Sequence, residues 1–288
     1  MTSAVAAEQA TAAIRHRRVD VGGVELHLAS LGSGRPVLLL HGFPEFWYAW
    51  RHQLEALAAA GFQALAPDLR GYNLSDKPRR RSSYRVDRLV ADIVGLIDAL
   101  GFERVPVVAH DWGGIIAYCL AEQHPERVER LAILNAPHPE LFRHAVRRPP
   151  QLWRSWYVFF FQLPWLPEWV VTRRRVMEST LSGSARPGAF ESEDMDRYVE
   201  AIRRPRAATS MLNYYRAAFR VPVRAPNPIQ AKTLILWGDR DRALGPELLD
   251  GIERYVPDVT VRHLPDAGHW LQYDAPDEVA RELLAFLG

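Results

Sequence analysis

Two kinds of hydrophobic pattern alternate along most of the chain. Short, solid apolar runs are typical of strands buried on both faces, and apolar positions recurring every three or four residues are typical of helices. The strand-like runs are Val37–Leu40, Phe62–Ala66, Val105–Ala109, Leu131–Leu134, Thr233–Trp237 and Val259–Leu264. The helical patterns are Trp50–Ala60, Val86–Leu100, Gly113–Gln123 and Asp277–Phe286. This alternation predicts an α/β fold, with a mostly parallel sheet and helices on both of its faces.

The start of the chain departs from this alternation. Residues 1–17 begin with an Ala-rich stretch and are predicted to form a loose arm. Two short alternating runs follow, Arg18–Val21 and Val24–Ala29, separated by Gly22-Gly23. A glycine pair between two such runs predicts a β-hairpin, which would bring the sheet to eight strands.

A second departure lies in the middle of the chain, between residues 137 and 228. No buried-strand run occurs there, and the helical stretches are interrupted by prolines and are rich in tryptophan, tyrosine and phenylalanine. Ligands of open α/β sheets bind at the carboxyl ends of the strands, where an aromatic insertion can roof a pocket. We therefore expect a core of residues 18–136 and 229–288, with 137–228 inserted as a helical lid.

Composition narrows the class of protein. The 288 residues hold 36 Lys and Arg against 34 Asp and Glu, a net charge of +2, which is too balanced for a dedicated nucleic-acid binder. One cysteine, Cys119, excludes an intrachain disulfide, and no apolar run approaches the ~20 residues of a membrane span. The amino-terminal stretch lacks a basic residue before Arg15 and makes a poor signal peptide. A cytoplasmic protein, monomeric or homodimeric, is expected.

The strongest chemical signal is His110-Asp111-Trp112-Gly113-Gly114, between a predicted strand and a predicted helix. Small residues at Ala109 and Gly113 flank position 111 at the spacing of a nucleophile elbow, G-x-S-x-G, in which a sharp turn exposes the central side chain. That side chain is here an aspartate. Asp111 could alternatively be a simple helix N-cap.

The order of acids and histidines favours the catalytic alternative. Asp239 and Asp241 follow the strand that ends at Trp237, and His269 follows the strand that ends at Leu264. Nucleophile, acid and histidine succeed one another in this order in the fold that carries such elbows. Spacing alone does not choose between the two acids.

A third motif, His41-Gly42-Phe43-Pro44-Glu45, directly follows a strand. Its glycine permits a tight turn, after which the Phe43 and Trp112 N–H groups could converge on one oxygen as an oxyanion hole. Together the sheet pattern, the HGFPE turn, the HDWGG elbow and the acid–histidine order resemble the α/β-hydrolase superfamily, and within it the epoxide hydrolases. The resemblance covers nearly the whole chain after residue 18.

This resemblance implies a role for each residue. Asp111 is the nucleophile, His269 the base and Asp241 the acid that orients it. The lid stretches around Tyr157 and Asn213-Tyr214-Tyr215-Arg216 are similar to the two segments that each supply a tyrosine in epoxide hydrolases, which selects Tyr157 and Tyr215. A tyrosine, with a pKa of about 10, can protonate the basic oxygen of an opening epoxide. The pocket is expected to include the side chains of His41, Pro44, Trp112 and Trp156.

Two alternative functions remain open at this point. A haloalkane or haloacid dehalogenase would use the same aspartate, although Phe43, Trp112 and Ile115 stand where many dehalogenases carry halide or carboxylate ligands. A ligand-binding protein could also retain the fold without catalysis. The prediction is a hydrolase that needs no cofactor and no metal, and that acts on a small apolar epoxide and water.

Overall fold

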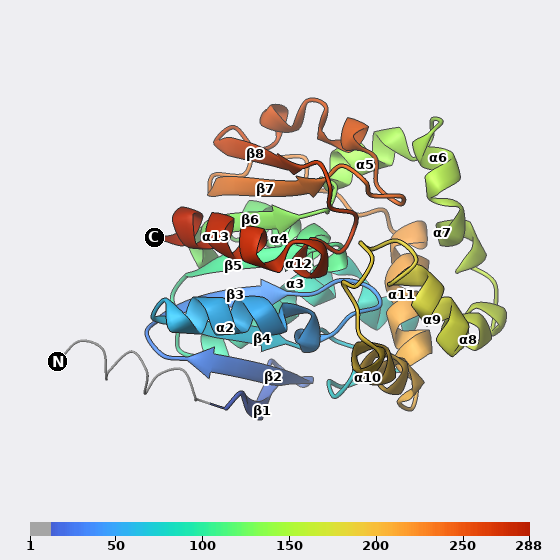
Figure 1. Cartoon of the computed structure of the whole chain (residues 1–288), viewed down its shortest axis with the longest axis horizontal. Coiled ribbons are helices and arrows are strands. Elements are labelled where there is room, and N and C mark those ends of the chain that lie inside the picture. The colour runs from blue at the N-terminus through green and yellow to red at the C-terminus, as the bar shows by residue number, and fades with distance from the viewer. Residues whose placement is uncertain (1–12) are drawn as a thin grey trace.

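The computed structural model describes residues 13–288, so most of the predicted arm lies outside the described residues. Eight strands form one sheet in the order β1-β2-β4-β3-β5-β6-β7-β8 (Figure 1). The pairs β1–β2 and β2–β4 are antiparallel and all the others are parallel, which confirms the predicted mostly parallel sheet. The parallel strands are β3 (Arg35–Leu40), β4 (Phe62–Pro67), β5 (Val105–His110), β6 (Val128–Leu134), β7 (Lys232–Gly238) and β8 (Val259–Leu264).

The predicted hairpin is present, but it begins earlier than expected. β1 (Arg15–Asp20) pairs with β2 (Glu25–Gly32) around Gly22 and Gly23, whose φ angles of 100° and 88° favour glycine. Residues 15–17 therefore belong to the sheet and not to the arm. Their side chains are exposed and polar, and the backbone pairing that places them along the sheet edge leaves no hydrophobic pattern in the sequence.

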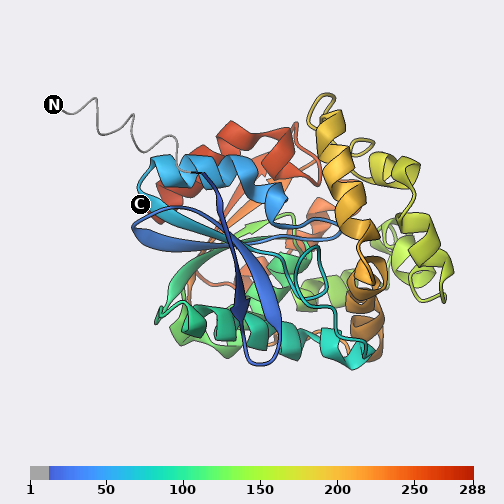
Figure 2. The ribbon, with the colours of Figure 1, turned by 90° about the horizontal axis from the view of Figure 1, so that it is seen from below.

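Helices cover both faces of the sheet, as Figure 2 shows with the sheet nearly edge-on. α2 (Arg51–Ala59) and α13 (Pro276–Leu287) lie on one face, and α3 (Val86–Ala99) and α4 (Trp112–Gln123) lie on the other. The period of two along β3 explains this layering, because Val37 and Leu39 join the core under α2 and α13 whereas Leu38 and Leu40 join the opposite core. Solid apolar strands are thus buried on both sides.

The chain that connects β6 to β7 forms seven helices, which lie at the end of the sheet where the parallel strands finish (Figure 1). Residues 135–231 contain no strand. The helices are α5 (Pro139–Ala145), α6 (Gln151–Arg154), α7 (Trp156–Phe160), α8 (Leu166–Val171), α9 (Arg174–Thr180), α10 (Ser192–Arg203) and α11 (Ala207–Arg220). We keep the word lid for residues 137–228. Within residues 13–288, no helix has both the length and the apolar character needed to cross a membrane.

Candidate active site

Asp111 occupies a strained turn between β5 and α4. Its φ of 48° and ψ of −118° lie outside the regions that non-glycine residues favour, which typically costs about 1–3 kcal/mol. The turn forms only because Gly113 has no side chain, since a Cβ there would stand 2.3 Å from the carbonyl oxygen of Leu40. This close approach of α4 to the end of β3 presents the Asp111 carboxylate at the carboxyl edge of the sheet.

The turn that follows β3 meets Asp111 directly. The Phe43 N–H donates to Asp111 Oδ1 over 2.8 Å, as predicted for one half of an oxyanion hole. Gly42 allows this approach, because a Cβ at position 42 would lie 2.4 Å from the Asp111 Cβ. Trp112 is the first residue of α4, where backbone N–H groups have no partner inside the helix, so its contribution to the hole stays a prediction.

His269 faces Asp111 from the loop after β8. Its Nε2 lies 3.8 Å from Asp111 Oδ2, and its Nδ1 lies 2.6 Å from Asp241 Oδ2. Asp239, the other acid that the spacing allowed, lies with His263 on the partly exposed side of β8, at 2.6 Å from its Nδ1. Of the two acids, the structure therefore brings only Asp241 into contact with His269.

The charges of this group reinforce one another. Burial alone would lower the pKa of His269, but the carboxylates of Asp241 and Asp111 raise it to about 9. Burial alone would raise the pKa of Asp241, but the charge of His269 and hydrogen bonds from its neighbours hold it below the ordinary value. In the resting state at neutral pH the group thus holds an imidazolium between two carboxylates.

Asn135 is a positioning residue that sequence reasoning missed. It directly follows β6, with φ at 34°, and its Nδ2 donates to Asp241 Oδ2 over 2.6 Å. Its Oδ1 accepts from the Gly238 N–H, while the Ala243 and Leu244 N–H groups donate to Asp241 Oδ1. The signal was available, because an asparagine at the carboxyl end of a parallel strand lies on the same edge as the predicted site.

Behind Asp111, a chain of buried polar side chains joins the three loops that carry the candidate residues. Glu45 accepts hydrogen bonds from the Gly42 N–H and from Gln272 Nε2, the latter over 2.6 Å. Its carboxylate also lies 2.7 Å from His110 Nδ1. His110 Nε2 donates to the carbonyl oxygen of His269 over 2.9 Å. Glu45 and His110 are fully buried, so this chain fixes the HGFPE turn, the end of β5 and the histidine loop relative to one another.

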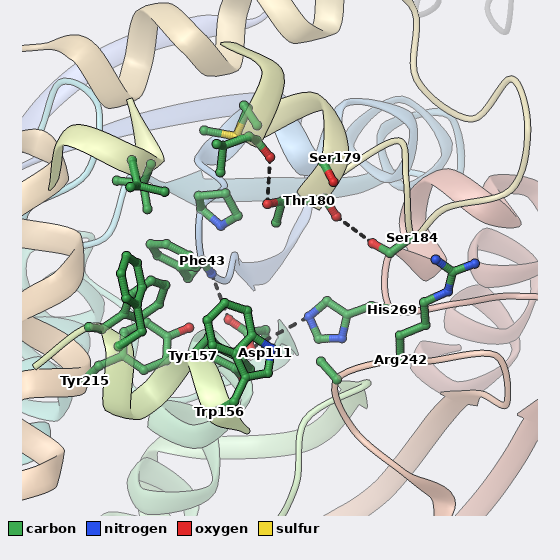
Figure 3. A pocket seen from close by; sticks show the side chains of 18 of the residues that line it. Phe43, Asp111, Trp156, Tyr157, Ser179, Thr180, Ser184, Tyr215, Arg242 and His269 are labelled. Atoms are coloured by element: carbon green, nitrogen blue, oxygen red, sulfur yellow. Dashed lines mark hydrogen bonds and ion pairs between the residues drawn. The ribbon is translucent and has the colours of Figure 1, made fainter. Parts of the chain in front are cut away.

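Tyr157 of α7 and Tyr215 of α11 lie far apart in the sequence of the lid, but their side chains lie close together in the structure. Their rings lie 6.0 Å apart and nearly perpendicular, and the Tyr215 ring also packs edge-on against Phe43 and Trp112. Figure 3 shows Asp111 with Tyr215 on one side and His269 on the other. Burial, with the nearby charge of Asp111, raises the pKa of both tyrosines, so both hydroxyls stay protonated and can donate.

Tyr214, the neighbour of Tyr215 on α11, turns away from this place. Its hydroxyl donates to the carbonyl oxygen of Arg70 over 2.7 Å, and its side chain is fully buried. Consecutive positions of a helix point about 100° apart, so only one of the two can face the nucleophile. The geometry brings Tyr215, and not Tyr214, beside Asp111.

Two cavities meet at these residues. The first encloses about 500 Å³ and is lined by Asp111, His269, Tyr157 and Tyr215, among others. The second encloses about 310 Å³ on the other side of the same tyrosines and also reaches Asp111. Pro44 and Trp156 line the first cavity and Trp112 lines the second. Asp111 therefore lies between two mainly apolar cavities under the lid.

The expectation that His41 lines the pocket is corrected by the structure. His41 is fully buried behind the turn, where its Nδ1 donates to the Gly42 carbonyl oxygen and its Nε2 accepts from the Leu69 N–H. Both ring nitrogens are thus occupied by the backbone, and the ring supports the turn. Trp156 lines the cavity only at its border, since 62% of its side chain is exposed. Among residues 13–288, no three His, Cys, Asp or Glu side chains gather as a metal site.

Comparison with known proteins agrees with this geometry. A sequence profile of the alpha/beta hydrolase fold matches residues 35–276. The chain is 40% identical to the AB hydrolase superfamily protein YfhM of Bacillus subtilis (strain 168), over 93% of this chain and 96% of that protein. It is 36% identical to human epoxide hydrolase 4, over 94% of this chain and 77% of that protein.

Solved structures give the same result. An epoxide hydrolase from Bacillus megaterium, determined as its M145A mutant, superposes with a TM-score of 0.87 at 35% identity, covering 94% of this chain and 99% of that one. The epoxide hydrolase VrEH1 from Vigna radiata superposes with a TM-score of 0.84 at 31% identity, covering 95% and 97%. The chain therefore belongs to the α/β-hydrolase superfamily and, within it, to the epoxide hydrolases.

Proposed function

We propose that this enzyme opens an epoxide to a vicinal diol through a covalent ester on Asp111. One observation carries the proposal: the Asp111 carboxylate is held by the Phe43 N–H at Oδ1 and faces His269 with Oδ2, beside the tyrosines 157 and 215. A carboxylate suits displacement at saturated carbon, and tyrosines supply the proton that an epoxide oxygen needs on leaving. The named relatives support the same class of substrate.

In the first half of the proposed reaction, Asp111 Oδ2 attacks one epoxide carbon. The carbon–oxygen bond of the ring breaks, and its electron pair goes to the epoxide oxygen, which takes a proton from Tyr157 or Tyr215. An ester then joins Asp111 to the substrate, and its carbonyl oxygen, Oδ1, stays at the Phe43 N–H. His269 plays no chemical part in this half.

In the second half, His269 first gives its proton to the tyrosine that lost one, because the neutral ester no longer stabilises the imidazolium. It then takes a proton from a water molecule that attacks Cγ of the ester. Negative charge develops on Oδ1, where the Phe43 N–H stabilises it, joined in this proposal by the Trp112 N–H. When the tetrahedral intermediate collapses, the diol leaves with Oδ2 of Asp111, and the carboxylate keeps the oxygen of the water. The hydroxyl proton of the intermediate passes to the departing diol oxygen, so Asp111 is again a carboxylate and His269 is again protonated. The net reaction consumes one water.

The electrostatics of the site fit this order of events. The charge of Asp111 helps to keep His269 protonated in the resting enzyme. Forming the ester removes that charge, so the pKa of His269 falls at the moment when a neutral base is required. The resting ion pair therefore becomes a general base only after the first half-reaction.

The two cavities support a small, mainly apolar substrate, with residues 137–228 acting as its lid. The single cysteine, buried in α4, suits a cytoplasmic location. We propose that the enzyme works there without a cofactor, as a monomer or homodimer.

Oxygen labelling tests the mechanism most directly. Excess enzyme would turn over styrene oxide once in ¹⁸O-water, and mass spectrometry would then measure the diol and the peptide that contains Asp111. The expected result is a diol without the label and a peptide that has gained it, because the oxygen of the diol comes from the carboxylate. Label in the diol and none in the peptide would overturn the covalent mechanism.

A variant gives the matching control. His269→Gln should form the ester but hydrolyse it slowly, so the intact protein gains the mass of the substrate. Asp111→Asn should show no such gain. Halide release from haloalkanes or haloacids, with no diol from any epoxide tried, would instead favour a dehalogenase.

A further inference from the structure

The outer surface of the lid is unusually apolar. Ten large apolar side chains are exposed among the described residues, and every one except Leu74 lies between residues 153 and 221. Single exposed apolar residues are ordinary on protein surfaces, but a gathering of them marks an interaction surface. We call six of them the aromatic face: Trp153, Trp156, Phe159, Trp165, Leu166 and Trp169.

These side chains gather because their helices are short and are packed on one side only. α6, α7 and α8 follow one another along the edge of the molecule that is farthest from the sheet (Figure 1). Trp156 and Phe159 stand three positions apart on α7, and Trp165 and Trp169 four positions apart at α8, so each pair shares one side of its helix. Trp165 is 78% exposed and Trp153 is 72% exposed, although burial would favour both.

Arginines are concentrated in the segment that carries this face, and Arg173 stacks on the ring of Trp169 at 4.0 Å. Residues 146–177 contain six arginines and a single acidic residue, Glu168, whereas the whole chain is almost balanced. Glu168 is already engaged in a salt bridge with Arg216. Within residues 13–288, four of the six arginines form no ion pair, namely Arg147, Arg148, Arg173 and Arg175.

Exposed tryptophan, phenylalanine and leucine among unpaired arginines suit one class of partner. Aromatic rings settle at the level of lipid headgroups, and arginines beside them are attracted to anionic lipids. A second copy of this face fits less well, because two sets of unpaired arginines would repel each other. We propose that the aromatic face docks the enzyme on the surface of an anionic phospholipid bilayer, without any segment that crosses it.

The positions of the two cavities indicate what docking through the aromatic face could serve. Trp156 borders the first cavity, while Phe159 and Phe219, whose rings lie 6.0 Å apart, border the second. Both chambers thus reach residues at or next to the aromatic face. An apolar compound dissolved in the bilayer would enter the site without passing through bulk water. Docking itself goes beyond the proposed reaction and does not depend on it.

Vesicle flotation tests the proposal on the full chain. The enzyme would be mixed with vesicles of roughly one-third phosphatidylglycerol in phosphatidylcholine, and with vesicles of phosphatidylcholine alone. We expect the protein to float with the anionic vesicles and to be released as the ionic strength rises, because salt screens the arginines. Flotation with neither kind of vesicle would overturn the proposal.

A double variant removes apolar contact without touching the cavities. Trp165→Asn suits the positive φ of 47° at that position, and Trp169→Gln suits a helix. Neither residue lines the two catalytic cavities, so hydrolysis of dissolved styrene oxide should be unchanged. Vesicle affinity should fall roughly tenfold or more. Unchanged affinity would exclude the aromatic face as the docking surface.

Two further double variants test whether binding depends on the arginines beside the aromatic face or only on the overall charge of the protein. Arg148→Gln with Arg173→Gln removes two unpaired charges beside the face, whereas Arg88→Gln with Arg281→Gln removes two exposed charges from α3 and α13 of the core. We expect roughly ten- to thirtyfold weaker binding for the first pair and little change for the second. Equal losses would mean nonspecific attraction and would contradict a docking face. Dimerisation through the face without vesicle binding would contradict it as well.

Discussion

The edge of the sheet and the lid contribute to the same site by different physical means. At the sheet edge the charged groups have fixed partners: Asp241 accepts four hydrogen bonds. The buried Glu45 accepts two and also lies against His110. The lid consists of short helices whose aromatic rings supply shape, two phenolic protons and an exposed outer face. The difference teaches that a rigid edge can hold the charged groups while a separate, less constrained layer sets the substrate and its access.

Removing the nucleophile should have the largest effect and should leave the lid intact. Asp111→Asn keeps the shape of the side chain and an acceptor for the Phe43 N–H, but a neutral amide is a poor nucleophile. We expect turnover of styrene oxide to fall by at least roughly 10⁴-fold. Steady-state kinetics measures the loss, and equilibrium binding of the diol measures whether the pocket remains. Asp239→Asn is the control, since Asp239 contacts His263 outside the site.

Removing the lid's phenolic protons should have the next largest effect. Tyr157→Phe and Tyr215→Phe preserve the rings but leave the epoxide oxygen without one donor each, and general acid assistance is worth roughly 10²–10⁴ in rate. The double variant should lose more than either single variant. Single-turnover rates of ester formation measure the loss, because hydrolysis of the ester does not use the tyrosines.

Tyr214→Phe supplies the matched control for this pair. It removes a phenol from the same helix, but one that is bonded to the Arg70 carbonyl oxygen and not directed at Asp111. We expect ester formation within a few-fold of the parent rate, with a loss of stability of about 1 kcal/mol. A larger catalytic loss in Tyr214→Phe than in Tyr215→Phe would reverse the assignment.

The sheet edge could be predicted from the sequence because its constraints are local. Solid apolar strands, the glycines at 42 and 113 and the order of acids and histidines all leave a mark in a few consecutive residues. Spacing alone left Asp239 and Asp241 open and the family resemblance selected Asp241, which is the acid whose side chain contacts His269. His41 was placed in the pocket wall because the sequence shows that it follows a strand, but not that both its nitrogens bond the backbone.

The lid could be predicted only in outline. Its aromatic content was visible and the family resemblance selected Tyr157 and Tyr215. The hydrophobic pattern did not show which rings of α5 to α9 face outward, because these helices of four to seven residues carry too few positions to define a periodic face. The place of Asn135 directly after a strand was visible, but its pairing was not, since its partner Asp241 is more than a hundred residues away along the chain. Long-range polar pairs leave no pattern in a single sequence.

The charge of His269 should make stability depend on pH, as a further property of the sheet edge. Its pKa is about 9 in the folded protein against 6.5 for an ordinary histidine, so the folded state binds the proton more tightly. The resulting stabilisation is complete below pH 6.5 and is lost as the pH rises through 9. Its size is about 3 kcal/mol. Urea unfolding between pH 6 and 10 measures it, and His269→Gln should flatten this part of the profile.

Asn135→Ala should have a smaller effect than the substitutions of Asp111, Tyr157 and Tyr215, and it tests whether the hydrogen bonds that hold Asp241 matter for catalysis. The variant removes one donor from Asp241 Oδ2 and leaves the Gly238 N–H without its acceptor, while both catalytic partners of His269 remain. Loss of one buried hydrogen bond costs roughly 1–3 kcal/mol, and part of that should appear as a roughly tenfold slower hydrolysis of the ester. Because Asp241 then takes more of its hydrogen bonding from His269, the pH profile of this step should also shift.

Ester formation should stay close to the parent rate, since His269 acts only afterwards. A purely structural role would instead lower stability and leave both the ratio of the two steps and the pH profile unchanged. Asn135→Asp would put a second carboxyl group beside Asp241 and should be worse than Ala, which separates the loss of a donor from the loss of an acceptor.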